Sequence, residues 1–160
     1  MKEFVERFEA RSKCRQVVFD YAYYFLFGEY PSIRDNIKCK SISGIYHFFV
    51  KKNILVRCRC SKIFLLNPIL AYIVLKSNLM TKNRKPKKRV AIITFSSAME
   101  LYGIEDLWTH YICETINNKE YRIYDPYYQY IFEDYKIKIP KLNKTRISNA
   151  KKFQLYLWIN

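Results

Sequence analysis

Apolar positions recur at two different periods along the chain, and the first period predicts helices near the N-terminus. In residues 13–27 the apolar side chains recur at helical spacing, and Gly28 is a natural helix terminator. Ser12 is placed to cap this helix, and residues 3–10 predict a shorter amphipathic helix before it. Aromatic residues also fall on the remaining faces of 13–27, so we expect this helix to be buried on most sides.

The middle of the chain has a pattern that is typical of strands. Residues 41–50 and 53–57 are rich in β-branched and aromatic side chains, which favour a pleated, half-buried surface. Asn67 and Pro68 then read as an N-cap followed by proline at the first helical position. These two residues predict a helix over 68–77.

Four further stretches predict antiparallel strands, namely residues 89–95, 108–116, 119–124 and 153–159. The chain has no internal repeat and no clear domain boundary. We therefore expect one α+β domain over residues 1–160, with helices mostly first and strands mostly last. The stretch KNRKPKKR at 82–89 carries six basic residues and one proline, and it predicts an exposed loop in that domain.

The two strands around Asn117 and Asn118 bring a histidine and a carboxylate together. Asn tolerates the left-handed conformation that tight hairpin turns require, so we expect these two residues to form the turn. The resulting register pairs residues whose numbers sum to 235 and sets His110 opposite Asp125. Opposed side chains share a face, with Cβ atoms about 4.5–5.5 Å apart. A carboxylate there can fix the imidazole tautomer and stabilise the imidazolium that forms during proton transfer.

Of the five cysteines, Cys14 has the surroundings that best suit a nucleophile. It lies in the first turn of the predicted helix, between Lys13 and Arg15. The helix dipole and the neighbouring cations both favour a thiolate at this position. Cys113 points to the face opposite His110, and the other three lie on or beside predicted strands and loops: Cys39, Cys58 and Cys60.

A Cys that opens a buried helix, then a His on a strand, then a hairpin partner that ends in Asp-Pro, resembles the papain-like superfamily. The transglutaminase-like, papain-fold toxin and double-glycine leader peptidase branches are the most similar. The matching residues lie within 12–34 and 106–128, and they are Cys14, Arg15, Ala22, Gly28 and Pro31, then His110, Tyr111-Ile112-Cys113, Asn117-Asn118, Arg122-Ile123-Tyr124 and Asp125-Pro126. The resemblance implies a papain-like fold, with a buried N-terminal helix packed on an antiparallel sheet.

The resemblance also implies roles for three residues, with Cys14 as nucleophile, His110 as base and Asp125 as its orienter. The implied activity is that of a hydrolase or acyltransferase on amide bonds of a protein or peptide, of the peptidase or glutamine deamidase type. Many members of the superfamily carry a Gln before the Cys as an oxyanion donor. Residues 1–13 contain neither Gln nor Asn, and no Gly precedes Cys14. The Cys14 backbone N–H remains as one oxyanion donor, and Trp108 is a weak second candidate.

The charge of the chain supports an alternative function. The formal net charge is +15, which favours association with an anionic partner. Aromatic side chains interleave with the basic ones, as they do in proteins that stack bases and follow phosphates. The alternative is therefore a non-catalytic basic module that binds nucleic acid, and its candidate contacts are Lys82, Arg84, Lys85, Lys87, Lys88 and Arg89.

The cysteines and the absence of phosphate-binding motifs bear on the compartment, metals and cofactors that we expect for this protein. The odd cysteine count and the charged start of the chain predict free thiols in a reducing, cytoplasmic compartment. Cys39, His47, Cys58 and Cys60 have metal-ligating side chains, but a C-x-C spacing is poor for structural zinc, and His47 is expected to fill the sheet instead. The chain contains neither GxGxxG nor GxxxxGK, so we expect no cofactor and no metal.

Overall fold

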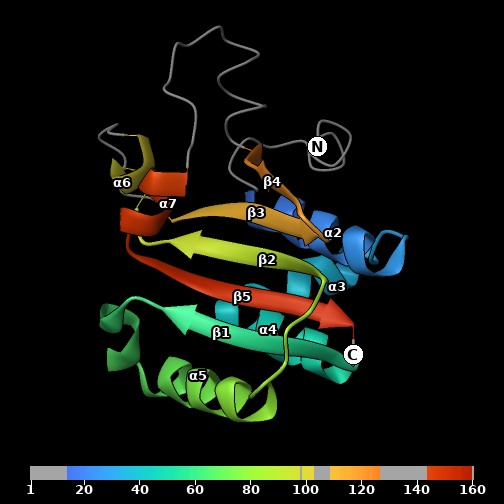
Figure 1. The fold of residues 1–160 in the computed structure, drawn as a ribbon, viewed down its shortest axis with the longest axis horizontal. Helices are drawn as coiled ribbons and strands as arrows, with labels where there is room; N and C mark the ends of the chain where they lie inside the picture. Colours follow the sequence, from blue (N-terminus) through green and yellow to red (C-terminus); the bar gives the residue numbers. More distant parts are fainter. Residues whose placement is uncertain (1–13, 98, 103–108, 127–143, 160) are drawn as a thin grey trace, which may run out of the picture.

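Five antiparallel strands form one sheet in the computed structural model, which describes residues 14–97, 99–102, 109–126 and 144–159. The strand order is β1-β5-β2-β3-β4 (Figure 1). The bounds are β1 Ile54–Cys60, β2 Lys88–Phe95, β3 His110–Asn117, β4 Glu120–Tyr124 and β5 Lys152–Ile159. The helices are α2 Cys14–Phe27, α3 Ile33–Lys38, α4 Ile42–Lys51, α5 Pro68–Met80, α6 Met99–Tyr102 and α7 Lys144–Asn149, with a 3-10 helix η1 at Lys62–Leu66. The α+β class is confirmed, and so are the four predicted strands of the second half.

Helix α2 is buried against one face of the sheet, as its apolar positions predict. Val18, Phe19 and Ala22 are inaccessible to solvent and pack among the side chains of β2, β3 and β5. The helix ends at Gly28, which takes a positive φ of 73° that favours glycine. The predicted cap Ser12, the predicted helix over 3–10 and the oxyanion candidate Trp108 lie outside the described residues.

Residues 41–50 form a helix, so the prediction of a strand there is wrong. Helix α4 begins at Ile42, where the Ser41 side chain accepts a hydrogen bond from the Gly44 amide. Its buried side chains are Ile45, Tyr46 and Phe49, at helical spacing. His47 is therefore exposed on a helix and does not fill the sheet, contrary to expectation.

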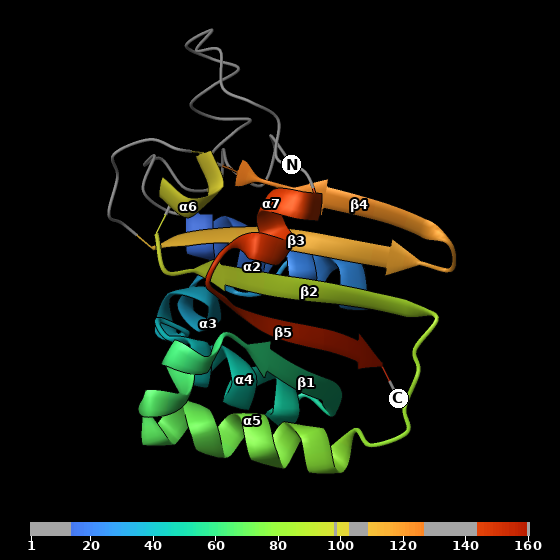
Figure 2. The same cartoon turned by 60° about the vertical axis from the view of Figure 1, so that its left-hand side comes forward.

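Helix α5 lies along the β1 edge of the sheet and begins where the sequence predicts. The Asn67 side chain accepts hydrogen bonds from the amides of Ile69 and Leu70, and Pro68 takes the first helical position. The helix continues to Met80, three residues beyond the predicted end. Figures 1 and 2 show α5 at the outermost edge of the molecule, on the far side of the sheet from β4.

A second, smaller apolar cluster lies on the other face of the sheet, near the end where β3 begins. Ile93, Phe95 and Ile112 of the sheet pack there against Leu101 of α6 and Ile147 of α7. This cluster surrounds the start of β3, and it therefore places His110 in an apolar environment.

Candidate active site

The hairpin of β3 and β4 holds His110 and Asp125 in direct contact. The His110 Nε2 atom lies 2.8 Å from Asp125 Oδ1, and both side chains are buried. The expected register is wrong, because the structure pairs Asn117 with Glu120 and turns at Asn118 and Lys119. The slip is two residues, and side chains alternate between faces with a period of two. His110 and Asp125 therefore keep the same face and meet diagonally instead of directly.

Complete burial determines the protonation of His110. The ring lies near Tyr102 in a tilted arrangement, with 5.9 Å between ring centroids, and its cross-strand neighbour is the buried Phe95. Desolvation lowers the pKa of His110 from 6.5 to about 3, while the Asp125 carboxylate opposes this shift because it favours the imidazolium. At neutral pH the ring is therefore neutral. Nε2 then carries the hydrogen that is donated to Asp125, and Nδ1 has the lone pair of a base.

Cys14 lies at the same end of the sheet as this pair. It is the first residue of α2, which runs in the same direction as β3 behind it, so the start of the helix lies near the start of the strand (Figures 1 and 2). The thiol interacts with the backbone amide of Tyr111, the neighbour of His110, and lies within electrostatic range of Asp125. The sulfur thus lies beside Tyr111 on the α2 face of the sheet, whereas the His110 side chain points to the other face, with Phe95 and Tyr102.

The thiol of Cys14 is not a thiolate at rest, contrary to the expectation from its place in the helix. Desolvation raises its pKa to about 11, and the Asp125 carboxylate adds to this increase. Backbone N–H groups of Tyr111, Arg15 and Cys14 favour the thiolate, but burial outweighs them. The Cys14 thiol and the His110 imidazole are therefore both neutral at rest.

Buried polar contacts hold the start of α2 against the segment that follows it. Arg15 donates hydrogen bonds to the carbonyls of Asn36 and Cys39, at 3.0 and 2.6 Å. The Asn36 amide in turn donates to the Gln16 carbonyl and to Asp20 Oδ1, at 2.8 and 2.6 Å. Arg15 is thus hydrogen-bonded to the backbone, and its main effect on Cys14 is to anchor the helix turn that carries it. Sequence reasoning named Arg15 only as a cation beside Cys14 and missed Asp20 and Asn36, because the partners in these contacts lie about twenty residues apart.

The other sulfur and imidazole side chains do not gather into a metal site. Cys39 and Cys58 are buried, Cys60 is half-buried, and His47 is exposed on α4. Among the described residues no group of three His, Cys, Asp or Glu side chains is arranged to hold a metal ion.

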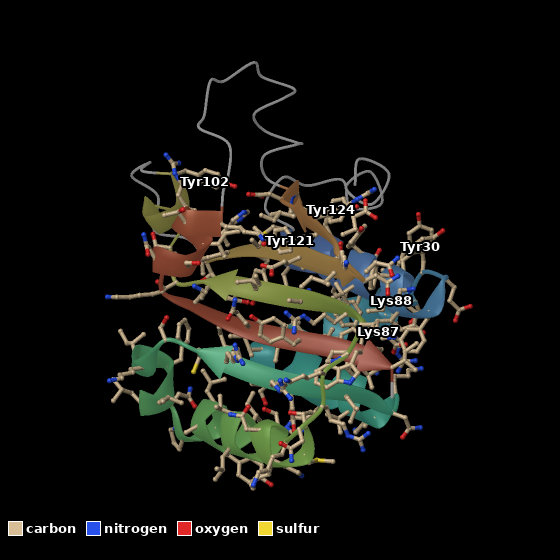
Figure 3. The ribbon with its side chains drawn as sticks, in the orientation of Figure 1. Tyr30, Lys87, Lys88, Tyr102, Tyr121 and Tyr124 are labelled. Carbon is tan, nitrogen blue, oxygen red and sulfur yellow. The ribbon has the colours of Figure 1, made fainter. Side chains whose placement is uncertain are left out.

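The basic segment 82–89 lies at the opposite end of the sheet from His110. Only its first part is a loop, because Lys88 and Arg89 already belong to β2. Since Phe95 pairs with His110, Lys88 lies about 23 Å from the site along the strand. Figure 3 shows Lys87 and Lys88 at one end of the molecule and Tyr102 at the other. This separation agrees with a segment that takes no part in chemistry at His110.

The basic loop is more ordered than a solvated connector. Arg57 donates hydrogen bonds to the carbonyls of Thr81 and Arg84 and to the Thr81 hydroxyl. Its guanidinium also lies over the Trp158 ring, 5.6 Å from the centroid. Beside the loop is an open pocket of about 390 Å³, lined by Leu26, Asn83, Arg84, Lys85, Pro86, Lys87, Lys88, Trp158 and Ile159.

The aromatic side chains give little support to a base-stacking surface. Among the described residues, the large aromatics that are exposed are Tyr24, Tyr30 and Tyr72. Trp158 is buried, and the Tyr156 ring is covered by Arg59 and Arg89 at 5.9 and 5.0 Å. Most aromatics of the described residues therefore belong to the core, and for this part of the chain the nucleic-acid alternative keeps only its charge argument.

Comparisons with known proteins leave the family open. No protein-family model matches the chain, and searches of curated proteins and of solved structures find no match. The papain-like interpretation therefore depends on the residues described above.

Proposed function

We propose that the protein is a thiol-nucleophile hydrolase or acyltransferase that acts on amide bonds of a protein or peptide. Cys14 is the nucleophile, His110 the general base and Asp125 the residue that orients His110. The observation that carries the proposal is the buried contact of 2.8 Å between His110 and Asp125, beside the start of the helix that opens with Cys14.

The buried His110–Asp125 pair favours a catalytic role because it is costly to the fold. Both side chains lie where apolar packing would be more stable, since burial of a carboxylate destabilises a fold unless it is paired. The contact is made through Nε2, so in the proposed reaction Nδ1 is the atom that accepts the thiol proton. A histidine that merely filled the core would need neither a carboxylate nor a cysteine at that end of the strand.

The chemistry follows from the neutral resting state. As the Cys14 sulfur bonds to the carbonyl carbon of the substrate, the thiol proton moves to His110 Nδ1 and the carbonyl π electrons move onto oxygen. The imidazolium is stabilised through its Nε2–H by the Asp125 carboxylate. Collapse of the adduct breaks the C–N bond, and the leaving amine takes the proton from Nδ1.

The resulting thioester is then hydrolysed. His110 removes a proton from water as the water oxygen bonds to the acyl carbon, and the C–S bond breaks to restore the thiol. The backbone N–H of Cys14 lies at a helix start, where the first amides have no partner within the helix, and it can stabilise the oxyanion. When the leaving group is an amine of a peptide the reaction is proteolysis, and when it is ammonia from glutamine the reaction is deamidation.

The test measures both reactions with one set of variants. Purified protein is incubated with a library of peptide amides, read by mass spectrometry, and with a glutamine-rich protein, read by ammonia release. We expect turnover that Cys14→Ala lowers by about 10⁴-fold or more. Cys60→Ala is the matched control, because Cys60 is the other half-buried thiol and should leave turnover unchanged.

Covalent labelling shows whether Cys14 responds to a substrate-like carbonyl. A peptidyl chloromethyl ketone presents such a carbonyl, so it should modify Cys14 faster than Cys60. Iodoacetamide lacks a peptide and should modify Cys14 only slowly at neutral pH, because the pKa of the thiol is raised to about 11. The proposal fails if the folded protein turns over neither substrate class and the ketone modifies both cysteines at equal rates.

A further inference from the structure

Helix α5 has apolar side chains on both of its faces, although the described residues cover only one of them. Its inner face packs on β1 and α4 through Ile73 and Ser77, which are fully buried. Its outer face and the preceding η1 expose a continuous series of apolar side chains, which are Ile63, Leu65, Leu66, Ile69, Tyr72, Leu75, Leu79 and Met80. Leu66 is 84% exposed and Leu79 is 68% exposed. We call these eight residues the α5 face.

Exposure on this scale is unusual within one stretch of a folded domain. Single exposed leucines are ordinary, whereas a contiguous apolar patch marks an interaction site. Residues 69, 72, 75 and 79 recur at the spacing of one helical stripe, so the exposed side chains lie side by side. Figures 1 and 2 show α5 as a ridge on the outside of the molecule, and a ridge fits a deformable surface better than a rigid groove.

The part of the chain that carries this face contains basic residues and no acidic ones. None of the 14 acidic residues lies between positions 36 and 99, whereas 14 of the 29 basic residues do. Exposed cations flank the α5 face along its length: Lys62 in η1, Lys76 in α5, and Lys82, Arg84 and Lys85 just after the helix. Lys76 lies over the Tyr72 ring, 5.7 Å from its centroid, in the middle of the stripe.

We propose that the α5 face docks flat on the surface of an anionic phospholipid bilayer. The aliphatic side chains enter the boundary between headgroups and acyl chains, and the flanking lysines and arginine bind the headgroups. Aliphatic contacts of this kind favour lipid over nucleic acid, whose bases stack on aromatic rings. Two copies of the face would also bring two strongly positive surfaces together, which disfavours a dimer. Within the described residues no helix is long and apolar enough to cross a membrane.

The sheet topology gives this docking an orientation. Strand β1 lies beside α5, and β3 is three strands further in the sheet order, about 14 Å away. The His110–Asp125 pair would therefore lie on the side of the domain that faces away from the bilayer.

The test is flotation of the full chain with vesicles of phosphatidylcholine alone or with added phosphatidylserine. Wild type should float with the anionic vesicles and should be released as salt rises. Replacement of Leu66, Ile69, Leu75 and Leu79 by Gln should lower the partition coefficient by about tenfold or more. Replacement of Ile33 and Ile37 by Gln is the matched control, because both isoleucines are exposed on α3, away from the α5 face.

A charge variant separates the two parts of the surface. Lys82→Gln with Lys85→Gln should weaken flotation several-fold, whereas Lys119→Gln with Lys144→Gln, exposed lysines beside β4, should change it little. Flotation that the four α5 substitutions leave unchanged would overturn the proposal, because binding would then be electrostatic alone. So would a wild-type dimer in sedimentation that ignores vesicles and becomes monomeric on those four substitutions, since the occupant would be a second copy. Thermal unfolding of each variant shows that it remains folded.

Discussion

The two edges of the sheet differ in opposite ways from an ordinary protein surface. At the β4 edge, an imidazole and a carboxylate are buried in contact, and a half-buried thiol lies within electrostatic range of the carboxylate. At the β1 edge, a continuous apolar stripe is exposed, and the part of the chain that includes this edge, positions 36 to 99, contains no acidic residue. One edge has polar groups where apolar ones would stabilise the fold, and the other has apolar groups where polar ones would keep it soluble.

Departures from the usual burial of apolar groups and exposure of polar groups are expected at functional sites. Elsewhere in a fold, these preferences agree with one another and stabilise it. Each edge breaks a different rule, so the two edges suggest two separate tasks. The chemistry of a thiol and a histidine belongs to the β4 edge, and surface attachment belongs to the β1 edge. The predictions below test whether the two edges are independent.

The largest effect is expected from removal of one charge at the β4 edge. Asp125→Asn keeps the size of the side chain but cannot stabilise the imidazolium, so turnover should fall by about 10³-fold, or about 4 kcal/mol in the barrier. Asp20→Asn is the matched control, because Asp20 is another buried carboxylate and it accepts a hydrogen bond from Asn36. It should lower the free energy of unfolding while turnover per folded molecule changes only a few-fold. Equal losses of turnover in both variants would mean that Asp125 is merely structural.

The second-largest effect is expected from isoleucine-to-alanine substitutions that compare the stability contributed by the two faces of α5. Ile73→Ala deletes a fully buried side chain and should lower the free energy of unfolding by about 3 kcal/mol. Ile69→Ala deletes a side chain that is 60% exposed and should change it by less than about 0.5 kcal/mol. Denaturant unfolding measures both values. A large loss for Ile69→Ala would show that protein covers the outer face and would remove the basis of the contrast.

Sequence patterns predicted the sheet better than the helices, and α4 shows why. Its ten residues are rich in isoleucine, phenylalanine and tyrosine, a composition that favours strands. Their period is nevertheless helical, and Ser41 is a helix cap. Composition was the weaker signal here, because the side chains meet their partners on β1 and not on a neighbouring strand.

The candidate site was predicted in its members but not in its electrostatics. Side chains alternate between the two faces of a sheet, so a shift of two residues in the register leaves His110 and Asp125 on the same face. Their contact is therefore compatible with the error in the expected register. The pKa of Cys14 depends on burial by segments distant in sequence, and the helix start therefore predicted its direction wrongly. The exposure of the α5 face was equally hidden, because a helix that is apolar all round is usually buried.

A smaller effect is the pH dependence that His110 gives to stability. Its pKa is lowered to about 3 in the folded state from an ordinary 6.5, so the unfolded state binds the proton first as pH falls. The stability is complete above about pH 6.5 and decreases toward pH 3, with a loss on the order of 2 kcal/mol at pH 5. Unfolding of His110→Gln should lack this component, whereas His47→Gln, at an exposed position on α4, should retain it. A protein that becomes more stable between pH 8 and pH 6 would instead hold an imidazolium against Asp125.

The smallest effect tests the hairpin register on which the β4 edge depends. Of the two residues that were expected to form the turn, Asn118 takes a positive φ of 58°. Asn117 is instead the last residue of β3 and pairs with Glu120. Asn118→Gly should leave the free energy of unfolding unchanged or raise it by a few tenths of a kcal/mol, because glycine adopts positive φ without steric cost. Asn117→Gly should lower it by about 0.5–1 kcal/mol, because glycine weakens a strand. Under the register with numbers that sum to 235, both residues would lie in the turn and both substitutions would be tolerated. Denaturant unfolding of the two variants therefore decides between a diagonal and a direct His110–Asp125 pair.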